Sequence, residues 1–337
     1  MGEKPSNPET YAHIGVIGAG AWGTALAIAA ARAGRKVTLW AREQEVVDSI
    51  ASTHVNAQFL PDVALPESIQ PTMDIALAAS ADAVLLASPA QHLRTTLSLL
   101  SRQLPRNAPV IACAKGIERG SGKLMTEVLA EFLDAENIGI LSGPSFARDV
   151  AKNLPTAVTI ASNMQAAQRL QSSLGHASFR PYASDDVTGV ALGGAAKNVY
   201  AIACGLVIGM GLGESARAAL LARSFAELRR LGEALGAKPE TLIGLSGLGD
   251  LVLTATSATS RNYSFGVAIG KGATRASLDA RGHPLAEGVE TAAALVARAK
   301  RHGIELPIAE ATAAILDGSL AVDAAIPHLM SRPLKAE

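Results

Sequence analysis

Residues 13–34 read HIGVIGAGAWGTALAIAAARAG, an apolar run and an alanine-rich run separated by glycines. The first part, HIGVIG, predicts a β-strand, and the part from residue 21 predicts a helix that ends at Gly34, because glycine is common just after a helix. The glycines between them form the pattern GxGxxG, which permits a tight turn, the close approach of a pyrophosphate and helix–strand packing. This context predicts a dinucleotide site whose pyrophosphate lies on N–H groups of the helix N-terminus. The predicted cofactor contacts are Gly18, Gly20, Ala21, Trp22 and Gly23.

Farther along, short apolar runs alternate with helical stretches. Strands are expected at 36–41, 81–88, 108–114, 137–143 and 156–162. Continuous apolar strands that alternate with helices are typical of a parallel, doubly wound sheet covered on both faces. After about residue 185 only helical patterns continue, in the runs 187–213, 214–236, 288–303 and 308–318. The sequence therefore predicts a disordered lead-in (1–12), an α/β Rossmann-type domain (13–187) and an all-α domain (188–337).

The composition argues against several classes of protein. Of the 337 residues 49% are apolar and 18% charged, and the net charge is zero, which disfavours a disordered chain and nucleic-acid binding. Cys113 and Cys204 stand in apolar settings with no second metal-type ligand nearby, so we expect two core residues and no metal site. The polar N-terminus has no hydrophobic signal region, and a reducing cytoplasm is the expected location.

The apolar run from Val187 to Gly213 contains one charged residue, Lys197. Its uncharged part, 198–213, is 16 residues long, fewer than the ~20 that a membrane-spanning helix needs. We therefore predict a helix buried in a soluble protein and no membrane span. An unpaired ammonium is costly to bury, so this lysine indicates a function. Gly193 and Gly194 are expected to let a ligand approach the helix closely.

The nucleotide site and the lysines together indicate hydride transfer. A nicotinamide dehydrogenase interconverts a carbonyl and an alcohol, so a proton donor must stand within hydrogen-bond reach of the oxygen. Lys197 suits that role because burial lowers the pKa of a lysine toward neutrality. Lys115, at the carboxyl end of strand 108–114, is expected to face the ligand crevice. Arg42 stands where an NAD-specific site has an acid, so we predict that NADPH is used at least as well as NADH.

Seven motifs then follow one another along the chain. They are GAGAWGTALA (18–27), NAQFLPD (56–62), AKG (114–116), SGPSFA (142–147), LGGAAKN (192–198), GLGDLVLT (247–254) and SRN (260–262). In this order they resemble the glycerol-3-phosphate dehydrogenase family, the soluble NAD(P)-dependent enzymes of bacterial type, over about residues 13–318. The resemblance implies a cytoplasmic homodimer that reduces dihydroxyacetone phosphate to sn-glycerol 3-phosphate with NADH or NADPH and supplies phospholipid synthesis.

The resemblance also implies roles for single residues. Lys197 would be the general acid/base, Asp250 would fix its charge and position, and Lys115 would contact both substrate and cofactor. The remaining implied substrate contacts are Gly143, Ser145, Ser260, Arg261 and Asn262, and the remaining implied cofactor contacts are Ala147, Arg261, Leu285 and Glu287.

Two alternatives stay open at this point. One is a 6-phosphogluconate or β-hydroxyacid-type dehydrogenase, against which the SRN and GLGDL motifs argue. The other is a regulator that binds NAD(H) without turnover, which would need a partner-binding or DNA-binding surface that the sequence does not indicate. Tyr263 and Ser264 stand where many relatives have a further arginine, and this predicts a weaker attraction for phosphate.

Overall fold

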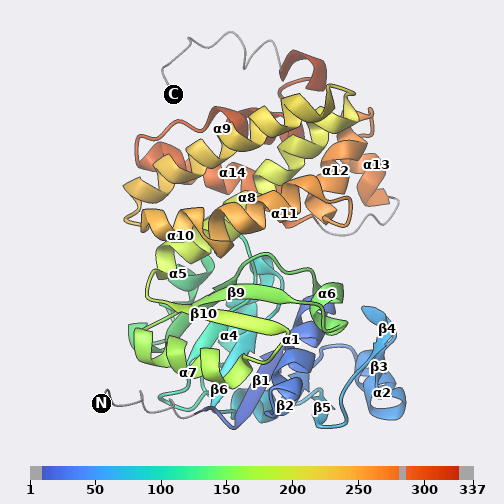
Figure 1. Cartoon of the computed structure of the whole chain (residues 1–337), viewed down its shortest axis with the longest axis vertical. Coiled ribbons are helices and arrows are strands. Elements are labelled where there is room, and N and C mark those ends of the chain that lie inside the picture. The colour runs from blue at the N-terminus through green and yellow to red at the C-terminus, as the bar shows by residue number, and fades with distance from the viewer. Residues whose placement is uncertain (1–9, 281–285, 326–337) are drawn as a thin grey trace. The chain divides into compact units, whose positions relative to one another are not determined.

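The computed structural model describes residues 10–280 and 286–325 and divides into two compact units (Figure 1). The first comprises the chain up to Ala114 together with Met125–Val190, and the second comprises Lys115–Leu124 together with the chain from Ala191. The boundary between the units lies between residues 190 and 191, three residues after the predicted boundary between 187 and 188. The segment 115–124 belongs to the helical unit, and no local sequence pattern had indicated this.

The described chain begins within the predicted lead-in. Tyr11 is buried, and its backbone N–H donates to Ser173 Oγ at 2.8 Å. The guanidinium of Arg169 lies 4.1 Å from the centre of the Tyr11 ring. Residues 10–12 are therefore packed against the first unit, and the predicted disordered lead-in is wrong for them.

The first unit is built on one eight-stranded sheet. Its strands are β1 (His13–Ile17), β2 (Lys36–Trp40), β5 (Ile69–Thr72), β6 (Ala83–Leu86), β7 (Val110–Ala112), β8 (Ile138–Ser142), β9 (Thr156–Ala161) and β10 (Phe179–Ser184). Their spatial order is β10-β9-β8-β7-β6-β1-β2-β5. The chain runs outward from β1 through β2 to β5 and then returns to β6 on the other side of β1, so the strand order reverses between β1 and β6. In such a sheet a ligand binds at this reversal, outside the carboxyl ends of the strands.

The sheet is mostly parallel, as predicted, with one exception. β8 and β9 pair antiparallel, with Leu141 opposite Ile160. The connection between them contains only the five-residue helix α6 (Ala147–Ala151), which is about 7 Å long. A parallel crossover usually contains a longer helix that packs along the sheet, and this short connection instead lets β9 enter in the opposite direction.

The remaining elements of the first unit cover the sheet or connect its strands. The helices are α1 (Ala21–Arg32), α2 (Gln44–Thr53), α3 (Ile75–Ala79), α4 (Leu93–Leu100), α5 (Met125–Leu129) and α7 (Met164–Leu174), with the 3-10 turns η1 (Ala90–His92) and η2 (Ala135–Asn137). A small hairpin, β3 (Val55–Asn56) and β4 (Leu60–Ala64), holds the NAQFLPD motif. Within it Asn56 Nδ2 donates to the Ala19 carbonyl and to Thr24 Oγ1, each at 2.8 Å, and so ties the hairpin to the glycine-rich turn.

The second unit is helical in all its elements that the structure describes. They are α8 (Val187–Gly209), α9 (Gly213–Ala234), α10 (Pro239–Ile243), the π-helical turn η3 (Leu245–Gly249), α11 (Asp250–Thr256), α12 (Arg261–Gly270), α13 (Arg275–Ala280), α14 (Glu287–Arg301) and α15 (Pro307–Asp317). Among these single helices α8 has the length and hydropathy of a membrane span, but 89% of its most apolar window is buried inside the protein, as is typical of a core helix. Both cysteines are buried as predicted, and burial raises the pKa of Cys204 to about 12.

Glycines let α8 and α12 cross at very short range. A Cβ added to Gly205 would stand 2.1 Å from the Tyr263 carbonyl oxygen, and one added to Gly266 would stand 2.1 Å from that of Ile202. A Cβ on Gly193 would likewise lie 2.6 Å from the Ser246 carbonyl oxygen in η3. The expectation that Gly193 makes room for a ligand is therefore wrong, because the neighbour that requires glycine there is protein backbone.

Candidate active site

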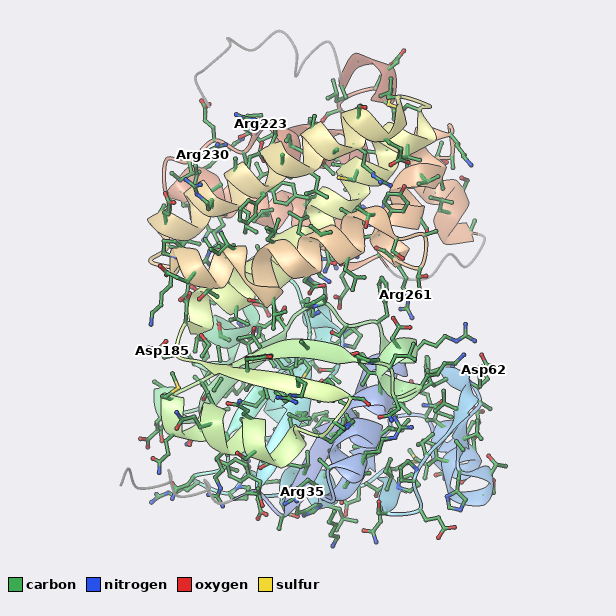
Figure 2. The ribbon with its side chains drawn as sticks, viewed as in Figure 1. Arg35, Asp62, Asp185, Arg223, Arg230 and Arg261 are labelled. Atoms are coloured by element: carbon green, nitrogen blue, oxygen red, sulfur yellow. The ribbon has the colours of Figure 1, made fainter. Side chains whose placement is uncertain are left out.

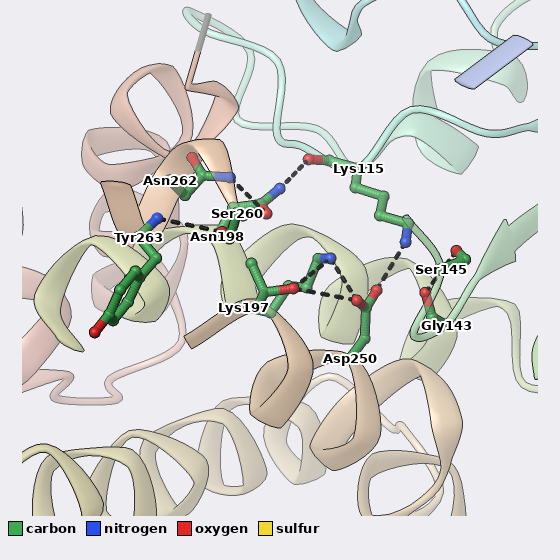
Figure 3. A network of polar contacts seen from close by, with 10 residues as sticks. Lys115, Gly143, Ser145, Lys197, Asn198, Asp250, Ser260, Asn262 and Tyr263 are labelled. Atoms are coloured by element: carbon green, nitrogen blue, oxygen red, sulfur yellow. Dashed lines mark hydrogen bonds and ion pairs between the residues drawn. The ribbon is translucent and has the colours of Figure 1, made fainter. Parts of the chain in front are cut away.

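Lys197 lies on α8, is 7% exposed and holds two polar partners (Figure 3). Its Nζ donates to Asp250 Oδ1 at 2.5 Å and to Thr254 Oγ1 at 2.9 Å. Burial lowers the pKa of Lys197 from 10.5 to about 8, although the nearby Asp250 carboxylate favours the charged form. An ammonium has three N–H donors, so these two bonds leave one for another acceptor. The lysine that sequence analysis singled out is thus buried, paired and able to gain or lose a proton near neutral pH.

Asp250 lies between two ammonium groups. It is 1% exposed and begins α11 directly after η3, and single π-helical turns are frequent at functional sites. Its Oδ2 accepts a bond of 2.8 Å from Lys115 Nζ, and its Oδ1 accepts the bond from Lys197. Burial by itself would raise the pKa of Asp250, but Lys115 and Lys197 together lower it below 3.8. The carboxylate therefore stays ionised at neutral pH.

Thr254 is a member of this cluster that sequence analysis did not predict. It lies one turn after Asp250 on α11 and is 3% exposed. Its hydroxyl donates to Asp250 Oδ1 at 3.3 Å while it accepts from Lys197. The available signal was the i, i+4 spacing of aspartate and threonine in GLGDLVLT, which places both side chains on one face of a helix.

The glycine-rich turn of the first unit has the shape that a dinucleotide requires. Gly18 has φ +111°, and a Cβ on Gly23 would stand 1.8 Å from the Gly18 carbonyl oxygen. Gly20 differs, because a Cβ there would meet no protein atom within 4 Å. The protein itself thus demands glycine at 18 and 23, while at position 20 the open backbone suits the close approach of a pyrophosphate. The first turn of α1, which includes Ala21 and Trp22, has no acidic residue and no side-chain cap.

Other predicted contacts belong to the same unit. Gly143 follows β8 with φ +140°, and a Cβ there would lie 2.9 Å from the Val158 Cα. Ser145 Oγ donates to the Gly143 carbonyl at 2.9 Å, and Ala147 begins α6. Arg42 has an exposed side chain whose Nη2 lies 2.6 Å from Glu43 Oε1.

The predicted phosphate segment forms the start of α12. Ser260 is buried, and its Oγ accepts from the Tyr263 N–H at 3.2 Å as the helix cap. Arg261 is the first helical residue, and its exposed side chain points outward from the helical unit (Figure 2). Asn262 faces the other way and is buried. Arg261 and the free end of α12 are therefore the groups of this segment that face solvent.

Asn262 and its neighbours connect three helices. Its Nδ2 donates to Asn198 Oδ1 at 2.9 Å, and its Oδ1 accepts from the Gly288 N–H at 2.9 Å. Glu287 begins α14, and its charge favours the protonated form of Lys197, which raises that pKa. Leu285, a predicted cofactor contact, lies outside the described residues.

The second unit thus brings together Lys115, Lys197, Asp250 and Asn262, and it adds Thr254 and Asn198 to them. The remaining predicted residues within the first unit are the glycine-rich turn, Arg42 and the SGPSFA turn. Over residues 10–280 and 286–325, no group of three or more His, Cys, Asp and Glu side chains is placed to hold a metal ion.

Comparisons with known proteins give matches over most of the chain. Residues 13–168 match the model of the NAD-dependent glycerol-3-phosphate dehydrogenase N-terminus, and residues 186–327 match the model of the C-terminus of the same family. A glycerol-3-phosphate dehydrogenase (NAD(P)+) of Parvibaculum lavamentivorans is 53% identical over 97% of this chain and 98% of its own. A glycerol-3-phosphate dehydrogenase (NAD(P)+) of Bradyrhizobium diazoefficiens is 55% identical over 96% of this chain and 98% of its own length. The crystal structure of glycerol-3-phosphate dehydrogenase from Coxiella burnetii superposes with a TM-score of 0.89 at 37% identity and covers 96% of this chain and 99% of its own.

Proposed function

The chain belongs to the NAD-dependent glycerol-3-phosphate dehydrogenase family, and from that premise we propose that it reduces dihydroxyacetone phosphate to sn-glycerol 3-phosphate with NADH or NADPH. It is an oxidoreductase with a nicotinamide cofactor. The observation that carries the chemical role is the buried cluster in which Lys197 and Lys115 share the Asp250 carboxylate. The reaction is reversible, and the same cluster can act in the reduction of the ketone and in the oxidation of the alcohol.

Lys197 is the proton donor in this proposal. A bound nicotinamide would supply hydride chemistry at the keto carbon, and the ketone oxygen would then require a proton donor. Lys197 has one N–H left after its bonds to Asp250 and Thr254, and it donates that proton to the oxygen. Because its pKa is about 8, the ammonium form prevails at neutral pH and the amine that remains is readily reprotonated. In the oxidation direction the same amine removes the proton from the alcohol.

The charges around Lys197 set how readily it gives up the proton. Asp250 stabilises the ammonium, while the positive charge of Lys115 on the other carboxylate oxygen works against it. Thr254 accepts from Lys197 and so fixes the direction of the Nζ. This arrangement holds the donor in place before the reaction and needs no rearrangement as charge develops.

The substrate phosphate is assigned to the start of α12. Arg261 offers planar donors that suit a phosphate dianion, and the N-terminus of a ten-residue helix favours negative charge. Ser260 and Asn262 are the other proposed contacts of this segment, and in the structure they support it from within: Ser260 Oγ caps the helix and Asn262 bonds Asn198 and Gly288. Gly143 and Ser145 are the proposed contacts from the first unit. The 6-phosphogluconate and β-hydroxyacid alternative finds no support in the family assignment.

One assay tests the proposal. Protein, NADPH and dihydroxyacetone phosphate are mixed, and the loss of nicotinamide absorbance is followed. Lys197→Ala should lower kcat by about 10²–10⁴-fold, the usual contribution of a positioned acid, with the Kd for NADPH within about twofold of the parent value. Near-normal turnover of this variant would contradict the role of Lys197. Oxidation with a β-hydroxyacid-type ketone in place of dihydroxyacetone phosphate would favour the alternative dehydrogenase.

We also propose a cytoplasmic homodimer that supplies phospholipid synthesis. We assign to its interface exposed apolar side chains of the helical unit, such as Leu212 (42% exposed) and Ile243 (57% exposed). Light scattering after size-exclusion chromatography measures the mass, and a monomer at micromolar concentration would contradict the dimer.

A further inference from the structure

Two buried asparagines link the backbone of Lys115 to the start of α14, and Figure 3 shows the part of this link from Asn262 through Asn198 to Lys115. Asn198 Nδ2 donates to the Lys115 carbonyl at 3.0 Å, and Asn262 Nδ2 donates to Asn198 Oδ1 at 2.9 Å. The Gly288 N–H donates to Asn262 Oδ1, also at 2.9 Å. Asn198 and Asn262 are 4% and 8% exposed, so water competes little for these bonds. The three bonds form an amide relay from α14 through α12 and α8 to Lys115.

The two ends of the relay determine the orientation of both amides. A backbone N–H, here that of Gly288, can only donate, and a backbone carbonyl, here that of Lys115, can only accept. Asn262 must therefore turn its oxygen to Gly288 and its nitrogen to Asn198. Asn198 must in turn present its oxygen to Asn262 and its nitrogen to Lys115. Each amide has one orientation that satisfies its neighbours, so the amide relay is polar and specific.

The relay also requires close packing where α14 begins. A Cβ on Gly288 would stand 2.5 Å from the Asn198 carbonyl oxygen and 2.9 Å from Asn262 Oδ1. Glycine at 288 therefore lets the helix start reach the two asparagines. This contact explains a glycine that the nucleotide motifs did not account for.

Lys115 stands outside any helix or strand, and Asn198 supports its backbone carbonyl. It begins the segment 115–124, which leaves the sheet after β7 and packs with the helical unit. Farther along this segment, Arg298 Nη1 donates to the Gly122 carbonyl at 3.1 Å. The backbone of Lys115 is thus held by Asn198, while its Nζ reaches Asp250 at 2.8 Å. Helix α8 therefore carries both the proton donor Lys197 and, one residue later, Asn198, which bonds the backbone of Lys115.

We propose that Asn198, oriented by Asn262, is a positioning residue that holds Lys115 in reach of Asp250. Asn198 acts on the reaction through Lys115 and makes no contribution of its own to substrate binding. The effect on turnover rests on the proposed function, since it presumes that the lysine cluster performs the proton transfer. The geometric part of the proposal is that the Lys115–Asp250 ion pair depends on Asn198, and this part is independent of the proposed function.

A double-mutant cycle tests the route of action. Asn198→Ala should lower kcat for dihydroxyacetone phosphate about tenfold in the parent protein, a coupling typical of residues in one hydrogen-bond network. Lys115→Met keeps the apolar stem and removes the charge. In that background Asn198→Ala should lower kcat by less than about twofold, because the group it positions is gone. Thr312→Ala is the matched control, because it also removes a buried bond from a side chain to a backbone carbonyl: Thr312 Oγ1 donates to the Ile308 carbonyl at 2.7 Å on α15.

A crystal structure of Asn198→Ala supplies a readout that does not depend on activity. Lys115 Nζ should lie beyond hydrogen-bond distance of Asp250 Oδ2. If that variant does not fold, Asn198→Ser, which is too short to reach the carbonyl, replaces it.

The outcomes separate the alternatives. A full tenfold loss in the Lys115→Met background would show that Asn198 acts on the substrate directly and would overturn the proposal. A lower unfolding temperature with unchanged kcat, as expected for Thr312→Ala, would reduce Asn198 to a packing role and overturn it as well. An intact Lys115–Asp250 bond in the crystal would do the same. A parent protein without activity on dihydroxyacetone phosphate would contradict the proposed function, and the crystal would still decide whether Asn198 positions Lys115.

Discussion

Replacing Asp250 with asparagine should move the pH dependence of ketone reduction. The substitution keeps the shape of the side chain and removes the charge that lies 2.5 Å from Lys197 Nζ. Asp250 favours the ammonium form of Lys197, and its loss leaves burial and the charge of Lys115, both of which lower that pKa. An opposite charge at this range changes a pKa by about 1–3 pH units, so we expect the pKa of Lys197 to fall by about 2.

The expected loss of rate follows from the fraction of Lys197 that carries its proton. Since its pKa is about 8, half of the parent protein is protonated at about pH 8. A pKa lower by two pH units leaves about 1% protonated there, so kcat for reduction should fall about 50-fold. Reduction requires the protonated form, and kcat in both proteins should therefore decline as pH rises through the pKa of Lys197. The midpoint of that decline should lie about two pH units lower in Asp250→Asn, and its kcat should recover as the pH is lowered.

The assay is kcat for NADPH oxidation by saturating dihydroxyacetone phosphate at closely spaced pH values. Thr254→Val is the matched control, because it removes a neutral partner of Lys197 and should move the midpoint by less than about one pH unit. The Kd for NADPH and the unfolding temperature report whether the fold is intact. A loss of activity in Asp250→Asn that is the same at every pH would refute the reasoning, since Asp250 would then act by another route than the proton affinity of Lys197.

Three further predictions concern the nucleotide site, the cofactor preference and stability. Gly20→Ala should change the free energy of unfolding by no more than about 0.5 kcal/mol and raise the Kd for NADPH about tenfold. In Gly23→Ala the added Cβ would lie 1.8 Å from the Gly18 carbonyl oxygen, so the free energy of unfolding should fall by about 1–3 kcal/mol. Equal effects on Kd and stability in both variants would count against the assignment. Arg42→Ala should lower kcat/KM for NADPH about 10- to 100-fold and leave that for NADH unchanged, and an equal loss with both cofactors would contradict a contact with the 2′-phosphate. Burial raises the pKa of Glu227, which accepts the Ile308 N–H at 2.7 Å, from 4.5 to about 7. Between these values the folded protein holds a proton that the unfolded chain has lost, so the unfolding free energy should fall by up to about 3 kcal/mol as pH rises from 4.5 to about 7. Urea unfolding at several pH values should show this decline in the parent protein and a flatter one in Glu227→Gln; identical slopes would exclude Glu227 as its source.

Local patterns in the sequence predicted much of the architecture. The strand–glycine–helix unit at 13–34 appears as β1, the glycine-rich turn and α1. The predicted helices at 214–236 and 288–303 appear as α9 and α14 with bounds that differ by one or two residues at each end. These elements have strong hydrophobic periodicity or clear glycine signals, and both depend only on neighbours in the chain. Strands without such a signal, such as β5 and β10, were not predicted.

The candidate site shows the same division. Lys197 was conspicuous because one charge in a long apolar run is costly, and Lys115 because it ends a strand of the sheet. No local signal paired either lysine with the carboxylate of Asp250, since 135 residues separate Lys115 from it and 53 separate Lys197. The role of Thr254 and the bond from Asn198 to Lys115 follow from the same packing of distant segments.

The sequence by itself indicated which residues have a special role. These are the glycines, where the backbone approaches another group closely, and Lys197, whose charge costs free energy to bury. The family resemblance already linked Lys197 to Asp250, but the other partners of these residues appeared only in the tertiary structure. It placed a protein carbonyl, and not a ligand, against Gly193. It also set Asp250 between two lysines, so that burial and opposing charges together bring the pKa of Lys197 to about 8. A sequence reveals that a buried charge needs compensation, but the distance and direction of the compensating group, on which its energy depends, arise only when the chain folds.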